Sequence, residues 1–367
     1  MASIDICGLR LAGQHLVKPT LHNASDVVRL LGAVQAQDYS GAKWALGQRA
    51  RGVSDAQVEQ EISDGAILRT HVLRPTWHFV APEDIRWLLA LTGPRVRALL
   101  RHYDGKLELD QAVLGRSRAV MTKALRDGNQ LTRAELATAL KDAGIRPGGT
   151  QRLAHIVMHA ELDGLICSGA RRGKQFTYAL LEERVAPARN LERDSSLREL
   201  ALRYFTTRGP ATEDDFAWWS GLTKTDAKAA AHFAEVSLDS EVIGGRKYWL
   251  SPSLSPSALT GKRRPRFTRL LPNYDEYFIG LKDRSAIQEK LRRAGMEGRV
   301  EFLGGHLIVV DGQIVGAWKR KLEGKSLAIP MKLLTPVSAT ERSAIVAEAK
   351  RLAAFLELSD NVEIAIS

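Results

Sequence analysis

The stretch LTRAELATALKDAGIRPGGTQRLAHIVMHAELDGLICSGARRGKQFTYAL, residues 131–180, contains the signals of two helices followed by a β-hairpin. Thr132 and Glu135 form a capping box, which predicts the start of the first helix. Thr150 opens the second helix, whose apolar residues recur at helical spacing. Alternating residues over 165–180 predict a hairpin with a basic tip. Two helices followed by a hairpin are typical of a winged helix, which is a DNA-binding unit.

The same order of signals occurs twice more. Before this stretch, an apolar helical stripe includes Val34, a capping box begins at Ser54, and alternating residues over 68–80 predict a hairpin that turns at Pro75. The third copy extends over 197–250. Its signals are helix starts at Thr212 and Thr223 and a strand pair around Gly244-Gly245.

A polar linker over 251–266, rich in Ser, Pro and Arg, separates these copies from a strand-rich region. Asp311-Gly312 is a strong hairpin signal, and Ser338 opens one helix that runs to about Leu356. The predicted strands are 267–271, 300–303, 307–310, 314–318, 331–334 and 362–366. We therefore predict an α+β fold of three tandem winged-helix units followed by a C-terminal small β-barrel domain. The predicted domains are 1–105, 106–190, 191–258 and 259–367.

Composition favours a polyanionic partner. The chain has 367 residues and a formal net charge of +11, which points to nucleic acid before membrane. Cys7 and Cys167 are too far apart in sequence for a Cys-x-x-Cys site, and His155 and His159 lack a further metal ligand. No apolar run approaches a membrane span. We expect a cytoplasmic, nucleoid-associated monomer without cofactor or metal.

Gln35 and Gln37 are the polar anomaly of the first copy. If the first helix continued, Gln37 would lie on its apolar stripe. In an extended segment, side chains two residues apart share a face, so both amides could converge if the helix ended near Gln35. In that case residues 38–41 are expected to form a turn. The alternative is an ordinary helix end at which the side-chain amides of Gln35 and Gln37 form hydrogen bonds within the protein.

Three segments resemble the AlkZ/YcaQ superfamily of winged-helix DNA glycosylases. They are residues 31–47 around Gln35-Ala36-Gln37, residues 68–78, and residues 271–284, which include Leu-Pro-Asn-Tyr-Asp-Glu-Tyr. The resemblance covers essentially the whole chain. In that superfamily a Gln-apolar-Gln motif is catalytic in the AlkZ-like branch, whereas the YcaQ-like branch has Asp at the last position. Gln35 and Gln37 therefore place this chain on the AlkZ-like side.

The resemblance implies a monofunctional glycosylase that excises N7-alkylated purines from double-stranded DNA, including bulky adducts and interstrand crosslinks. An N7-alkylated purine is cationic and already a good leaving group, so a water held by two amides could suffice. Asp275 and Glu276 could stabilise the developing positive charge, or could pair with Arg284 or a neighbouring arginine. The alternative function is a non-catalytic winged-helix DNA-binding regulator. Candidate DNA-binding residues are Arg69, His71, Arg74, His78, Arg171, Arg172, Lys174, Lys262, Arg263, Arg264, Lys319 and Arg320.

Overall fold

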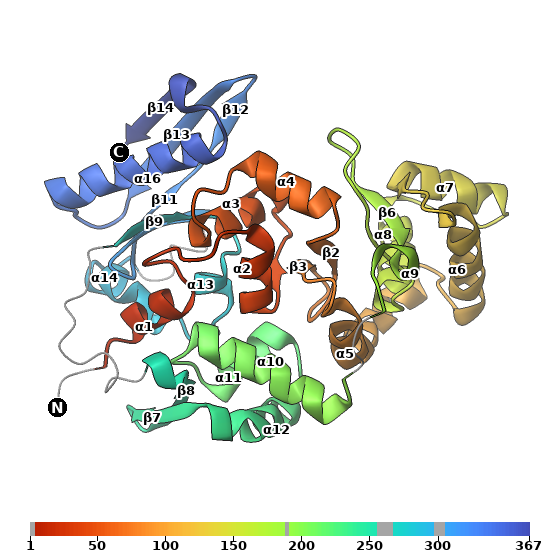
Figure 1. Ribbon diagram of the computed structural model, residues 1–367, viewed down its shortest axis with the longest axis horizontal. Coiled ribbons are helices and arrows are strands. Elements are labelled where there is room, and N and C mark those ends of the chain that lie inside the picture. Colours follow the sequence, from red (N-terminus) through yellow and green to blue (C-terminus); the bar gives the residue numbers. More distant parts are fainter. Residues whose placement is uncertain (1–3, 188–190, 255–266, 297–304) are drawn as a thin grey trace.

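The computed structural model describes residues 4–187, 191–254, 267–296 and 305–367. Figure 1 shows a central N-terminal region with three groups of elements around it. The second helix and hairpin group lies to its right, the third lies below it, and a sheet with one long helix lies at the upper left. The architecture is mixed α+β, as predicted.

The central region holds the first predicted hairpin and one helix that the sequence did not reveal. The first helix of the predicted apolar stripe ends at Leu31, where Gly32 at φ +76° is its C-cap. The chain is extended from Val34 to Gln35. Residues 38–41 are not a turn, because Asp38 caps a helix by accepting from the Gly41 N–H at 3.0 Å. The elements are α1 (Ile6–Gly13), α2 (Ala24–Leu31), β1 (Val34–Gln35), α3 (Tyr39–Arg49), α4 (Asp55–Ser63), β2 (Leu68–His71) and β3 (Trp77–Val80).

The second group follows the predicted order closely. The capping box of Thr132 and Glu135 is present, and Thr150 is the first residue of the next helix. Its hairpin forms a three-stranded sheet in the order β4-β6-β5. The elements are α5 (Ile85–Lys106), α6 (Gln111–Leu125), β4 (Leu131–Thr132), α7 (Arg133–Asp142), α8 (Thr150–Leu162), β5 (Ile166–Ser168), β6 (Thr177–Leu180) and α9 (Leu181–Arg184).

The third group has both predicted helix starts and the predicted strand pair. Thr212 and Thr223 accept hydrogen bonds from the backbone N–H groups of Asp215 and Asp226, and the hairpin turns at Gly244-Gly245. Trp218 is 43% exposed, whereas Trp219 is buried. The elements are α10 (Arg193–Arg208), α11 (Glu213–Ser220), α12 (Lys224–Ala234), β7 (Asp239–Ile243) and β8 (Arg246–Leu250).

The C-terminal region is a six-stranded sheet that forms a half-barrel. Among the described residues β9 and β14 have no pairing with each other, so the predicted small β-barrel is present as a half-barrel. The predicted strand over 300–303 lies outside the described residues. The elements are β9 (Thr268–Leu271), α13 (Glu276–Ile279), α14 (Glu289–Arg293), β10 (His306–Val310), β11 (Gln313–Trp318), β12 (Lys321–Glu323), β13 (Ser326–Leu333), α16 (Ala339–Phe355) and β14 (Val362–Ile366).

Two hydrophobic cores meet on opposite sides of the first hairpin. One core joins α2, α3 and α4 to α16 and the C-terminal sheet, and includes Trp44 and Phe355. The other joins β2 and β3 to α5 and α10 to α12, and includes Trp219. The sheet β1-β3-β2 therefore lies between the cores, which fixes the position of the strand that carries Gln35.

Candidate active site

Gln35 lies on an edge strand whose position is set from both sides. β1 pairs with β3 so that Gln35 is opposite His78, and the Ala36 N–H donates to the Trp77 carbonyl at 2.7 Å. Gln35 is 6% exposed, whereas Gln37, just past the strand, is exposed. The chain is therefore extended through Gln35, as the hypothesis of two converging amides required, but it bends at Gln37. The two glutamines differ in burial, however.

Arg74 fixes which way the Gln35 amide faces. Its Nη2 donates to Oε1 of Gln35 at 2.8 Å. A guanidinium carries only donors, so the amide atom beside it must be the carbonyl oxygen. Burial lowers the pKa of Arg74, while the nearby Glu276 charge raises it. The carbonyl oxygen of the Gln35 side chain consequently faces Arg74, and its NH2 group is available to a ligand.

Gln37 has the complementary property. Within the described parts of the chain, its side chain has no hydrogen bond, and it is open to solvent. Its amide can rotate to accept or donate. The motif thus combines one oriented amide on β1 with one free amide at the bend that follows the strand.

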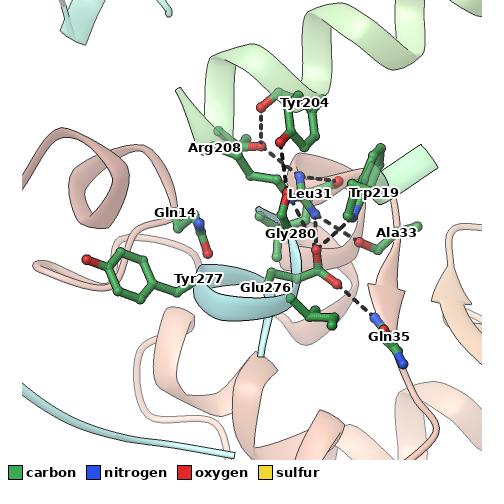
Figure 2. Close-up of polar contacts among 12 residues, drawn as sticks. Gln14, Leu31, Ala33, Gln35, Tyr204, Arg208, Trp219, Glu276, Tyr277 and Gly280 are labelled. Carbon is green, nitrogen blue, oxygen red and sulfur yellow. Dashed lines mark hydrogen bonds and ion pairs between the residues drawn. The ribbon is translucent and has the colours of Figure 1, made fainter. Parts of the chain in front are cut away.

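Glu276 lies directly behind the Gln35 strand and is completely buried (Figure 2). Its Oε1 accepts from the Gln35 backbone N–H at 2.9 Å. Its Oε2 accepts from Arg208 Nη2 at 2.6 Å and from Trp219 Nε1 at 2.8 Å. The same guanidinium donates to the carbonyls of Leu31 and Ala33, at the end of α2 and before β1. This buried ion pair connects the third group to the backbone on both sides of Gly32.

Asp275 forms a second buried ion pair. Both of its carboxylate oxygens accept from Arg49, at 2.8 and 2.9 Å, and Arg49 also donates to Gln14. Both partners are fully buried. The structure thus matches the ion-pairing interpretation of Asp275 and Glu276, with Arg49 and Arg208 as the arginines. Neither carboxylate is exposed to a ligand in this conformation.

A buried polar row crosses the sheet beside Gln35. In register, Gln35 lies opposite His78, which lies opposite Thr70. His78 Nδ1 donates to the Thr76 carbonyl, and burial lowers the pKa of His78 to about 3, so the ring is neutral. Within the described residues, His78 Nε2 and Thr70 Oγ1 have no hydrogen-bond partner. His78 is therefore an interior residue and not a surface contact for DNA.

His71 is also interior. Its Nδ1 lies 2.5 Å from a carboxylate oxygen of the fully buried Glu161 on α8. This contact joins the first hairpin to the second group. It argues against the predicted role of His71 in direct DNA binding.

The remaining predicted DNA-binding residues divide by exposure. Arg69 is buried, and burial lowers its pKa to about 10. Arg171 is partly buried against Glu59. Arg172 and Lys174 are exposed at the hairpin tip of the second group. Lys319 is exposed and Arg320 is partly buried, whereas Lys262, Arg263 and Arg264 lie outside the described residues.

The histidines of α8 belong to a local network. His155 and His159 both contact Asp104, at 3.1 and 3.0 Å. In the described ranges, three or more His, Cys, Asp or Glu residues are nowhere grouped as a metal site would require. None of the described helices combines the length and apolar character needed to span a bilayer.

Comparison with known proteins identifies the family. The family model "DNA glycosylase AlkZ-like" matches residues 28–355. The chain belongs to the AlkZ-like DNA glycosylase family. It is therefore a DNA repair enzyme that hydrolyses N-glycosidic bonds, and the alternative of a non-catalytic regulator is not favoured.

Two findings from Streptomyces sahachiroi agree with this family. An "Interstrand DNA cross-link repair glycosylase" is 26% identical over 94% of this chain and 93% of the relative. The solved structure of DNA glycosylase AlkZ matches the fold with a TM-score of 0.78 and 22% identity, covering 99% of this chain and 98% of that one.

Proposed function

We propose that this enzyme hydrolyses the N-glycosidic bond of N7-alkylated purines in double-stranded DNA, with Gln35 and Gln37 positioning the attacking water. The hydrogen bond from Arg74 to Gln35 carries the proposal, because it gives the two amides different tasks. We propose that the Gln35 NH2 group donates to one lone pair of the water. The Gln37 carbonyl oxygen then accepts a hydrogen bond from the water, and the second lone pair attacks C1′ as the C1′–N9 bond breaks. The cationic base leaves as a neutral N7-alkylpurine, and the extra proton on the new hydroxyl group passes to bulk water.

The chemistry of the leaving group makes two neutral amides sufficient. A purine alkylated at N7 carries a positive charge, so it departs without a general acid. What the enzyme must supply is a water in the correct place as the sugar becomes oxocarbenium-like. A glutamine amide is a weak base, so a modest rate enhancement on an intrinsically labile bond is expected.

Glu276 acts in this proposal through the backbone of the motif strand. The Glu276 carboxylate is one hydrogen bond from the Gln35 N–H, and its charge is compensated by Arg208. It supports the position of the motif strand without touching the sugar. Asp275 holds Arg49 in a separate buried pair.

Bulky adducts and interstrand crosslinks belong to the proposed substrate range. The similarity to a relative named an interstrand DNA cross-link repair glycosylase supports this extension. We further propose that the three helix and hairpin groups are winged helices that bind the duplex as a monomer. The exposed Arg172 and Lys174 would contact phosphates from the second hairpin.

The direct test is a duplex that contains one N7-methylguanine. Incubation with the enzyme should release the methylated base and leave an abasic site, which alkali converts to a strand break. The Gln37→Ala variant is the matched control, since Gln37 is exposed and its loss should leave the fold unchanged. Intact DNA after incubation with folded wild-type protein would reject this substrate class.

Arg74 provides a second test of the division of tasks. Arg74→Met keeps an unbranched apolar stem but removes the guanidinium donor, so the Gln35 amide is free to rotate. We expect a loss of at least tenfold in the excision rate, about 1.4 kcal/mol of barrier, with little change in duplex affinity. An unchanged rate would show that the orientation of Gln35 is irrelevant.

A further inference from the structure

A second concave site lies between the first hairpin and the second group. Here β2 lies beside β5, and the Arg69 N–H donates to Ser168 Oγ at 2.8 Å. The pocket beside them has a volume of about 510 Å³, within the range of small-molecule sites. Residues that line it include Arg69, Trp77, Arg133, Lys174, Phe176 and Tyr178.

The walls of this pocket are flat and positively charged. The Arg69 guanidinium lies 4.2 Å from the centre of the Trp77 ring and 4.5 Å from that of Phe176. The Arg133 guanidinium also lies over the Trp77 ring, 5.8 Å from its centre. None of the described residues that line the pocket is Asp or Glu. Aromatic rings and guanidinium planes are the surfaces on which proteins stack bases.

The pocket is bonded to the catalytic motif but lies on the other face of its strand. The Ala36 N–H donates to the Trp77 carbonyl, and Arg69 Nε donates to the Ala36 carbonyl at 3.2 Å. Residues alternate between the faces of a sheet, so Trp77 projects away from the face shared by Gln35 and His78. The residue between the two glutamines therefore forms the boundary between two sites.

We propose that this pocket receives an unstacked nucleobase of the bound DNA, with its ring on Trp77 and Arg69 and its phosphate near Lys174. A nucleotide combines a planar ring with a negative charge, and the pocket offers the complement of both. Lys174 is exposed at the tip of the hairpin, where a phosphate can reach it. The inference rests on the proposed function, which brings DNA past the Gln35-Ala36-Gln37 segment.

Binding measurements on lesion-free DNA test this pocket without requiring catalysis. Three duplexes are compared: one fully paired, one with a single extrahelical nucleotide, and one with the same bulge lacking its base. Because stacking of a base contributes about 1–3 kcal/mol, we expect the enzyme to bind the base-bearing bulge at least about fivefold more tightly than the base-less bulge. Equal affinity for the two bulges would overturn the proposal, since both deform the backbone alike.

Two variants of Trp77 localise the effect. Trp77→Leu should abolish the preference for the base-bearing bulge and change affinity for paired duplex less than twofold, whereas Trp77→Phe should retain most of it. A Trp77→Leu variant that keeps the full preference would also overturn the proposal. If Trp77→Leu does not fold, the comparison of the two bulges with the wild type still decides. If the enzyme releases N7-methylguanine but binds both bulges equally, the pocket alone is rejected. If it prefers the base-bearing bulge but releases no base, the proposed function is rejected.

Discussion

Replacing Glu276 by Gln should destabilise the protein because it leaves Arg208 as an unpaired buried charge. Both side chains are completely buried, so solvent cannot compensate. Removing one partner of a buried pair costs about 3–5 kcal/mol. The new amide has only one oxygen, so its NH2 group must face either the Trp219 Nε1–H or the Gln35 backbone N–H. Whichever donor faces the NH2 group loses its acceptor. These losses share one site and do not simply add. We therefore expect about 3–5 kcal/mol in total.

Urea unfolding followed by circular dichroism measures this loss. With a slope of about 3 kcal/mol per M, the expected loss lowers the midpoint by about 1–1.7 M. Glu83→Gln is the matched control, because Glu83 pairs with Arg29 at the surface, where a pair contributes less than about 1 kcal/mol. Its midpoint should barely change.

A double variant separates the ion pair from the other contacts. Arg208→Met combined with Glu276→Gln removes both charges, so it should be less destabilised than the sum of the single variants. A Glu276→Gln protein that unfolds at the wild-type midpoint would refute the reasoning. If such a protein also lost base excision, Glu276 would act on the reaction directly and not through the backbone of Gln35.

Three further outcomes are expected. Gln37→Ala should reduce the excision rate of N7-methylguanine at least tenfold, which corresponds to about 1.4 kcal/mol of activation barrier, and Gln35→Ala should also be impaired. The double variant should be little worse than the less active single variant. Single-turnover assays measure these rates, and a folded double variant with the wild-type rate would contradict the assignment. Replacing Arg172 and Lys174 by Ala should flatten the log-log salt dependence of duplex binding by roughly 0.9 per lost phosphate contact, and an unchanged slope would remove this hairpin from the interface. His78, whose pKa is lowered to about 3 by burial, stays neutral in the folded protein while the unfolded chain binds a proton below about pH 6.5. The wild type should therefore lose about 2 kcal/mol relative to His78→Gln between pH 7 and pH 5 in urea titrations, and parallel curves would argue against a neutral buried ring.

Local signals in the sequence predicted most of the secondary structure. The capping boxes at Ser54, Thr132 and Ser338 are present, as are the predicted hairpin turns. A capping box depends on groups three residues apart, and a tight turn depends on the allowed conformations of a few residues, so neither needs tertiary context. The helix α3 was missed because Asp38 and Gly41 suit a turn as well as a helix start. The resemblance to AlkZ-like glycosylases likewise came from contiguous segments.

Only the tertiary structure decided which polar side chains are buried and with what partners. Arg208 and Glu276 are 68 residues apart, and Glu276 and Gln35 are 241 apart, so no local pattern could pair them. The same holds for Arg74, which was predicted to contact DNA and which donates a hydrogen bond to the Gln35 amide. Burial results from packing several elements around one sheet, and it converts an exposed charge into one that must find a partner. The sequence by itself therefore determined most of the helices, the hairpins and the family, whereas packing determined that Gln35 is held by Arg74 and Glu276 while Gln37 stays free.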